Sequence, residues 1–321
     1  MKLLSKLNIA KSTGHDNVGA RFMKDGRNYI VTPLAYIINL SLKVGVFPDD
    51  MKIARVVPLY KKGNINLESN YRPISILPVV SKIIERVVHD QFHQYLVEKG
   101  LIYRFQSGFR PNHSTDTALT YLADQIRFNM DKNYYTGVVL LDLQKAFDTV
   151  NHDILLKKLK AIGINDTTYA WFSSYLKERK QFVELNGVKS SLQTITCGVP
   201  QGSIMGPLMF TIYVNDMKTS VLCDLYLNAD DSAMVCSGKN VLEIEQTLSH
   251  ELSKVQKWLE INRLSLHLGK TESILFGKKK MLKKEQKLRV KCNGFEIESK
   301  DEIKYLGLVM DQEMRGSNAG N

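Results

Sequence analysis

The sequence predicts an α+β fold in which a small antiparallel sheet is backed by helices. Two observations indicate this class. Between residues 136 and 311, short apolar runs alternate with longer stretches in which apolar residues recur every three or four positions. Asn-Gly pairs at 186–187 and 293–294 lie between strand-like runs and predict hairpins. The 321 residues suffice for one large domain or two ordinary ones, and because no repeat or flexible linker interrupts them, we expect one continuous architecture.

The helices are predicted from this spacing and from the residues at their ends. Asn151 and Asn240 precede two helical stretches as N-caps, and Gly100 is a stop signal after another. Glu243, three residues after Asn240, adds the signature of a capping box. The predicted helices cover residues 79–100, 152–163, 207–217 and 240–262.

The strands are predicted from short β-branched and leucine-rich runs. The stretch "DLYLNADDSAMV" (224–235) is predicted to form two strands joined by an acidic turn. Further single strands are predicted at 136–143, 264–268, 272–277 and 303–311. In chain order the core is therefore strand, helix, hairpin, helix, strand.

The chain is strongly basic, with a net charge of +11 and a pI of about 9.3. This excess favours a polyanionic partner, nucleic acid or an acidic membrane surface, although a merely basic soluble protein remains the alternative. The four cysteines include no CxxC pair, which argues against zinc and disulfides and fits a reducing compartment. Because no signal peptide or bilayer-spanning stretch is found, we expect a soluble intracellular protein of the nucleus or cytoplasm.

Three carboxylates are predicted to meet at one edge of the sheet. Asp142 lies near the end of one strand, and Asp230 and Asp231 lie at the tip of the acidic hairpin. Hard oxygen ligands without His or Cys suit Mg²⁺ or Mn²⁺. Two such ions about 3.5 to 4 Å apart would support in-line phosphoryl transfer. The alternative is that the acid pair only decorates a solvated turn.

Several segments, in this order along the chain, resemble the motifs of reverse transcriptases, specifically those of non-LTR retrotransposons of the LINE or jockey kind. The resemblance extends over roughly residues 11–311. Its central segments are "LDLQKAFDTVNHDILLKKL", "GVPQGSIMGPLMFTIYVNDM" and "YLNADDSAMV". The flanking ones include "ARVVPLYKKGN", "NYRPISILPVVSKIIERVV", "FQSGFRPNHST", "LSLHLGKTESILFG" and "KYLGLVMD".

This resemblance implies a right-hand polymerase with fingers and palm, the palm being the small antiparallel sheet. The implied activity is RNA-directed DNA synthesis from deoxynucleoside triphosphates on an RNA template and a DNA primer. Asp142 and Asp230 would hold two magnesium ions, assisted by the backbone carbonyl of Leu143, and Asp231 would complete the acidic edge.

The resemblance also implies residues that contact the nucleotide. Lys61 and Arg72 would grip the triphosphate, a task suited to a compact ammonium and a bidentate guanidinium. Phe147 would be the sugar gate, whose ring excludes a ribose 2′-hydroxyl. Gln201 would lie against the incoming nucleotide, next to Gly202 in a tight bend. Without the motifs, the charged residues would be interpreted as surface groups and Phe147 as a core aromatic.

Lys270 in "LGKTES" is implied to lie near the triphosphate and the leaving pyrophosphate. A phosphate-binding P-loop is excluded because its first glycine would fall on Leu264. A surface lysine is the alternative. The basic run at 278–291 has a similar pair of interpretations, a solvated loop or a contact with template–primer phosphates.

By the same resemblance the chain divides into successive parts. These are fingers with an N-terminal extension (1–135), a first palm segment (136–163), a connection with a hairpin (164–197), the palm (198–311) and a truncated tail (312–321).

Two positions depart from the family pattern. Asn228 stands two residues before the paired acids, where the family usually has an aromatic that packs beside the primer end. The asparagine loses apolar area at a half-buried strand position, so we expect weakened or lost activity. His267 stands where an asparagine is typical.

Neither the endonuclease nor the thumb of such elements has residues to build it, so we expect a fragment of a retrotransposon polyprotein. Two functions remain open: an RNA-directed DNA polymerase, or a non-catalytic remnant or co-opted nucleic-acid-binding module of the same fold. A group II intron maturase or a telomerase-like enzyme predicts the same palm but would require further domains. The sequence gives no indication of the oligomeric state.

Overall fold

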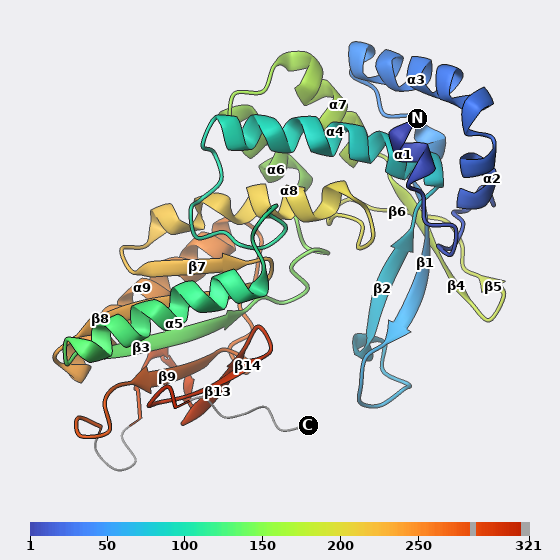
Figure 1. Ribbon diagram of the computed structural model, residues 1–321. Helices are drawn as coiled ribbons and strands as arrows, with labels where there is room; N and C mark the ends of the chain where they lie inside the picture. The colour runs from blue at the N-terminus through green and yellow to red at the C-terminus, as the bar shows by residue number, and fades with distance from the viewer. Residues whose placement is uncertain (283–286, 316–321) are drawn as a thin grey trace. The chain divides into compact units, whose positions relative to one another are not determined.

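In the computed structural model, which describes residues 1–282 and 287–315, the chain forms two compact units (Figure 1). The first unit comprises Met1–Leu101 and Phe147–Tyr213, and the second comprises Ile102–Ala146 and the chain from Val214 onward. The mixture of helices with several sheets agrees with the predicted α+β class. One continuous architecture was expected because no linker interrupts the chain, but two units are found. The chain passes from the second unit to the first between Ala146 and Phe147, inside the motif "QKAFDT", so this boundary is not marked by a linker.

The first unit combines helices with one sheet. Its helices are α1 (Lys2–Ser5), α2 (Ala20–Asp25), α3 (Arg27–Val44), α4 (Val79–Glu98), α6 (His152–Ala161), α7 (Asp166–Leu176) and α8 (Met205–Val214), with 3₁₀ turns η1 (Asp49–Lys52) and η2 (Glu68–Asn70). Its strands are β1 (Ile53–Tyr60), β2 (Tyr71–Ile76), β4 (Lys180–Leu185), β5 (Val188–Lys189) and β6 (Gln193–Thr194).

The sheet of the first unit is built around β1 and β4. Strand β1 pairs antiparallel with β2 and parallel with β4, which in turn pairs with β5 and β6. Asn186 and Gly187 form the predicted two-residue turn between β4 and β5, with φ of 51° and 81° as a type I′ turn requires.

The second unit contains the predicted antiparallel sheet. Its helices are α5 (Thr115–Asp131) and α9 (Val241–Ile261), with the 3₁₀ helix η3 (Asn215–Ser220). Its strands are β3 (Tyr135–Asp142), β7 (Asp224–Asn228), β8 (Asp231–Gly238), β9 (Glu272–Phe276), β10 (Lys291–Cys292), β11 (Phe295–Glu296), β12 (Glu298–Ser299), β13 (Glu302–Tyr305) and β14 (Leu308–Asp311). The main sheet has the order β12-β9-β3-β8-β7, and only β12 joins it in parallel.

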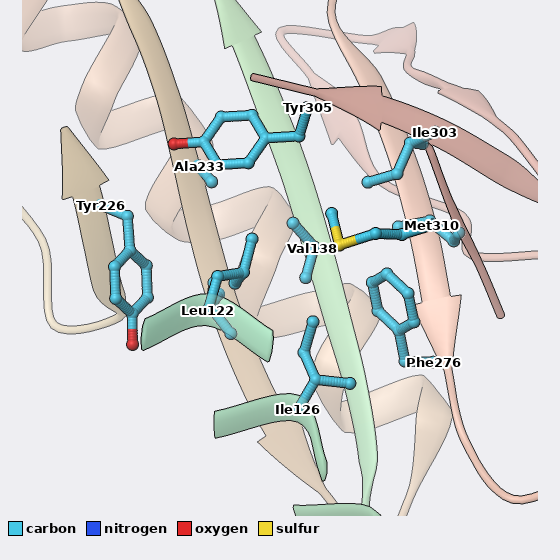
Figure 2. Close-up of a cluster of buried hydrophobic side chains, with 11 residues drawn as sticks. Leu122, Ile126, Val138, Tyr226, Ala233, Phe276, Ile303, Tyr305 and Met310 are labelled. Atoms are coloured by element: carbon cyan, nitrogen blue, oxygen red, sulfur yellow. The ribbon is translucent and has the colours of Figure 1, made fainter. Parts of the chain in front are cut away.

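Helices α5 and α9 cover opposite faces of this sheet, as the alternation of side chains along β3 shows. Val138 packs in one cluster with Leu122 and Ile126 of α5, which Figure 2 shows together. The next residue toward the N-terminus, Gly137, faces the other side, where a Cβ would meet Ile244 of α9 at 2.6 Å. The β13–β14 hairpin adds Ile303, Tyr305 and Met310 to the cluster on the α5 face (Figure 2).

Several predicted elements are confirmed with small shifts at their ends. Helices α4, α6, α8 and α9 correspond to the predicted ones, and α8 begins two residues earlier than expected. Asn151 and Asn240 cap α6 and α9 by accepting from the backbone N–H of Ile154 and Leu242, both at 3.0 Å. Glu243 does not complete a capping box, because its carboxylate accepts from the Asn240 side chain at 3.4 Å.

Two strand predictions are wrong. Residues 264–268 form no strand and contribute only an isolated bridge between Leu266 and Leu143, because this segment turns back after α9. The single strand expected at 303–311 is two strands, β13 and β14. They are joined by a turn at Leu306 and Gly307, whose φ values are 48° and 91°. The sequence did not indicate this hairpin, because the first turn residue is leucine and not the asparagine or aspartate that usually precedes the glycine.

The sequence patterns did not predict strands β1 and β2 or helices α3 and α5. Within the described part of the chain, no helix has the length and apolar character needed to cross a membrane.

Candidate active site

The predicted site residues fall into two groups, one in each unit. In the second unit, the sheet register brings the acids to one edge. Asp142, the last residue of β3, lies directly opposite Asp231, the first residue of β8. Directly opposed residues on antiparallel strands project from the same face, so the two carboxylates share one side of the sheet. Asp230 precedes Asp231 in the two-residue turn between β7 and β8.

The acids repel one another electrostatically. The pKa of Asp231 is raised to about 6, by burial of its carboxyl and by the charges of Asp230 and Asp142. Burial and the two neighbouring carboxylates all disfavour the charged form of this side chain. A cation bound beside these acids would offset their mutual repulsion.

The acidic turn is wedged against the "FQSGFR" segment of the same unit. Ser107 donates its backbone N–H to Leu227 O at 2.8 Å, and Leu227 donates to Phe105 O at 3.0 Å. A Cβ on Gly108 would lie 2.3 Å from the backbone nitrogen of Ala229, so only glycine fits there. Ala229 itself has a φ of 59°, a left-handed backbone conformation that is costly for a residue with a Cβ.

The segment after α9 approaches the same acid edge. His267 donates its backbone N–H to Asp142 O at 2.7 Å, and Gln144 donates to Ser265 O at 2.9 Å. These two hydrogen bonds form the isolated β-bridge between Leu143 and Leu266. The Leu143 carbonyl takes no part in either bond. Lys270 lies on this segment, with Nζ 3.9 Å from Oδ2 of Asp142. Because both side chains are well exposed, this ion pair adds little to stability, and it places a cation beside the acids.

A divalent metal fits the donor chemistry of this edge. Among residues 1–282 and 287–315, no group of three or more His, Cys, Asp or Glu side chains is placed to hold a metal ion, so the expected three-carboxylate cluster is not found. Magnesium does not require one, since it is commonly held by one or two carboxylates together with waters and substrate phosphates. Asp142 and Asp230, with the Leu143 carbonyl, could therefore hold it.

Tyr305 is a residue near the acids that sequence reasoning missed. It is 3% exposed and belongs to the cluster on the α5 face, where Figure 2 shows its ring beside Ala233. Burial and the negative charge of Asp231 both raise the pKa of its hydroxyl. The segment "KYLGL" signalled it only through the family resemblance, because apolar spacing predicted a plain strand.

In the first unit, the glycine-rich loop is bonded to the segment after Ala146. Gly198 donates to Val150 O at 2.7 Å, and Val199 donates to Phe147 O at 2.8 Å. Gly198 has a φ of 83°, and a Cβ there would lie 2.7 Å from Asp148 O. The His152 ring, through Nε2, contacts Gly198 O at 2.7 Å. Two motifs that are separate in sequence therefore form one local structure.

Gln201 and Gly202 connect this loop to β2. The side chain of Gln201 donates to Oδ1 of Asp148 at 2.8 Å, and its carbonyl accepts from Ser75 N at 2.7 Å. Gly202 has a φ of 125°, and a Cβ there would meet Ser75 O at 2.4 Å. The close approach explains why glycine is needed, and Asp148 is a partner of Gln201 that the sequence analysis did not identify.

The ring of Phe147 is half-buried and stacks on Phe210 of α8, with centroids 4.6 Å apart and an interplanar angle of 30°. Its position is therefore set by α8, although periodicity alone did not predict a partner for it.

Lys61 and Arg72 lie together on the β1–β2 hairpin. Arg72 pairs with Leu59, and Lys61 extends the ladder by donating its backbone N–H to Asn70 O at 2.9 Å. In this register the two basic side chains emerge on the same face, and both are exposed. The basic run predicted at 278–291 lies partly outside the described residues, at 283–286.

The comparisons with known proteins give the family. The model of the family "Reverse transcriptase (RNA-dependent DNA polymerase)" matches residues 59–310. The "RNA-directed DNA polymerase from mobile element jockey" of Drosophila melanogaster is 31% identical over 323 residues, covering 97% of this chain and 34% of that protein. The jockey protein of Drosophila funebris is 30% identical over 328 residues, covering 98% of this chain and 35% of that protein.

The "Probable RNA-directed DNA polymerase from transposon BS" of Drosophila melanogaster is 29% identical over 323 residues, covering 98% of this chain and 35% of that protein. The chain thus spans about a third of the length of these relatives. The chain therefore belongs to the reverse transcriptase family, among the enzymes of non-LTR retrotransposons.

Proposed function

We propose that this chain is an RNA-directed DNA polymerase domain that adds deoxynucleotides to a DNA primer on an RNA template. We assign the antiparallel sheet that carries the acids to the palm and the β1–β2 hairpin to the fingers of a right-hand polymerase. The register of β3 and β8, with Asp142 opposite Asp231 and Asp230 in the adjoining turn, is the observation that carries the proposal.

Asp142 and Asp230, with the carbonyl of Leu143, would hold two magnesium ions. When bound, such ions activate the primer 3′-hydroxyl and stabilise the leaving pyrophosphate. Asp231 would add negative charge to the same face. Lys270 would leave its ion pair with Asp142 to contact the triphosphate, which its exposed and therefore weak pairing permits.

Residues of the first unit would select the nucleotide. Lys61 and Arg72, on one face of the β1–β2 hairpin, would bind phosphate oxygens. The Phe147 ring, supported by Phe210, would exclude the 2′-hydroxyl of a ribonucleotide. Gln201 would be held ready by Asp148 to contact the deoxynucleotide.

The test is magnesium-dependent primer extension on an RNA template, comparing the native chain with Asp230→Asn. The substitution keeps the size of the side chain and removes the charge that would bind the metal. We expect extension by the native chain and a loss of about a thousandfold or more in the variant, the equivalent of about 4 kcal/mol in the barrier.

Asp224→Asn is the matched control, because it makes the same change at the far end of the same hairpin, where the carboxylate accepts from the Gln125 amide at 2.8 Å. It should retain extension. Equal extension by the native chain and Asp230→Asn would contradict the metal role. Salt-sensitive RNA binding without extension by the native chain would instead favour a non-catalytic binding module.

A further inference from the structure

A buried polar cluster in the first unit contacts the end of the glycine-rich loop. Glu85 of α4 is fully buried, and Arg179 is 1% exposed. The Glu85 carboxylate accepts two hydrogen bonds, from the Tyr175 hydroxyl at 2.9 Å and from the backbone N–H of Ile204 at 2.6 Å. Because a buried carboxylate is costly unless paired and hydrogen-bonded, this arrangement requires an explanation.

Arg179 supplies the opposite charge. Its Nη1 donates to Tyr175 O at 3.1 Å, and its guanidinium lies 4.8 Å from the centre of the Tyr175 ring. Burial raises the pKa of Glu85, and the positive charge of Arg179 is the largest effect that opposes the rise. The Tyr175 hydroxyl and the Ile204 N–H each donate to a different oxygen of the Glu85 carboxylate, so both oxygens act as acceptors.

The residue that Glu85 anchors joins two parts of the proposed nucleotide site. Ile204 immediately precedes α8, so the carboxylate lies at the positive end of that helix. Gln201 stands three residues before Ile204, and Phe210, which stacks on Phe147, stands six residues after it. A shift of Ile204 would therefore move the glutamine and the aromatic stack together.

We propose that Glu85 is a positioning residue for nucleotide selection, which anchors Ile204 and thereby holds Gln201 and the Phe147–Phe210 stack in place. Tyr175 and Arg179 support it by a hydrogen bond and by charge. The proposal rests on the proposed function, because it concerns how that site distinguishes deoxynucleotides from ribonucleotides.

Glu85→Gln tests it, because glutamine keeps the size of the side chain but presents an NH₂ to one of the two donors. The matched control is Glu251→Gln in the second unit. Glu251 is also buried and accepts from a backbone N–H, that of Leu222, at 2.5 Å, and from Lys254 at 2.7 Å. Both variants remove one buried carboxylate that holds a backbone amide.

The first measurement is the ratio of deoxynucleotide to ribonucleotide incorporation in primer extension, with KM and kcat for each. We expect Glu85→Gln to lower this ratio about tenfold and to raise the KM for the deoxynucleotide, whereas Glu251→Gln leaves the ratio unchanged. If Glu85 had a purely structural role, the variant would contain less active enzyme, and incorporation of deoxynucleotides and ribonucleotides would fall by the same factor. An unchanged ratio in an active Glu85→Gln enzyme would therefore overturn the proposal.

The second measurement is amide hydrogen exchange, which does not depend on activity. Exchange across residues 198–206 should be faster in Glu85→Gln and unchanged in Glu251→Gln. Unchanged exchange in Glu85→Gln would overturn the anchoring role. A native chain without polymerase activity would contradict the proposed function and the selectivity it implies, while this exchange measurement would still decide whether Glu85 anchors the loop.

If Glu85→Gln does not fold, Tyr175→Phe is the milder variant, since it removes only the hydroxyl that donates to Glu85. It should change both readouts in the same direction and by less. No change in either readout would overturn the proposal.

Discussion

The two groups of site residues are held in place in different ways. In the second unit, main-chain hydrogen bonds between β3, β7 and β8 position Asp142, Asp230 and Asp231, and these bonds do not depend on the carboxylate side chains. In the first unit, the loop around Gly198 and Gly202 depends on missing Cβ atoms and on buried side chains such as Glu85.

Because of this difference, substitutions in the two groups should have different effects, on activity in the second unit and on stability in the first. An acid at a strand end can be exchanged for its amide without disturbing the register, so its loss should affect activity and leave stability intact. A loop residue cannot be exchanged so freely, because the added atoms collide with backbone. Four substitutions test the contrast, in decreasing order of expected effect.

Asp142→Asn should have the largest effect, a loss of activity of about a thousandfold, which corresponds to about 4 kcal/mol in the barrier. Stability should not fall, because the substitution removes a charge that repels Asp231. Primer extension and thermal unfolding measure the two effects. A large drop in the melting temperature would show that the Asp142 side chain also stabilises the strand end. That result would contradict the view that main-chain hydrogen bonds alone position this acid.

Gly202→Ala should destabilise the chain by about 3 kcal/mol or more, because it combines a φ of 125° with a Cβ 2.4 Å from Ser75 O. The matched control is Gly187→Ala in the β4–β5 turn. There φ is also positive, at 81°, but a Cβ would meet nothing within 4 Å, so the cost should be about 1 kcal/mol. Urea unfolding of both variants measures the difference, and equal losses would show that φ rather than close approach sets the requirement.

Asn228→Tyr should raise the rate of primer extension about tenfold, or about 1.4 kcal/mol in the barrier. Asn228 is half-buried on β7 opposite Asp231, so an aromatic ring there adds apolar surface beside the acids. Extension rates at saturating deoxynucleotide provide the measurement. A rate equal to that of the native chain would mean that the asparagine is not the lesion that the family pattern suggests.

Ala229→Gly should have the smallest effect, a stabilisation of about 0.5 to 1 kcal/mol. Ala229 has a φ of 59°, which glycine adopts without the steric cost that a Cβ imposes. The midpoint of urea unfolding measures it. Ala233→Gly, at a buried site on β8 with extended backbone, is the control and should destabilise instead.

Local patterns predicted much of the fold. Apolar spacing predicted α4 and α9, and turn chemistry predicted the hairpins at Asn186–Gly187 and Asn293–Gly294, because both signals arise from neighbours in the chain. The same approach failed at 264–268 and at Leu306–Gly307. Apolar composition at these places does not distinguish a strand from a turn, because both segments are only partly buried.

The site was predicted in part. The motifs identified Asp142, Asp230 and the glycine-rich loop, but no pattern indicated that Asp148 binds Gln201 or that Glu85 anchors Ile204. These partners stand 53 and 119 residues apart, so no short-range spacing records them.

By itself the sequence determined the local elements, the residue types of the acid edge and the family to which the chain belongs. Only the tertiary structure decided the pairing of Asp142 with Asp231, the wedge of Gly108 against Ala229 and the burial of Glu85. The physical reason is that helix periodicity and turn preference depend on a few adjacent residues. Strand register, close backbone approach and desolvation depend on which distant segments pack together.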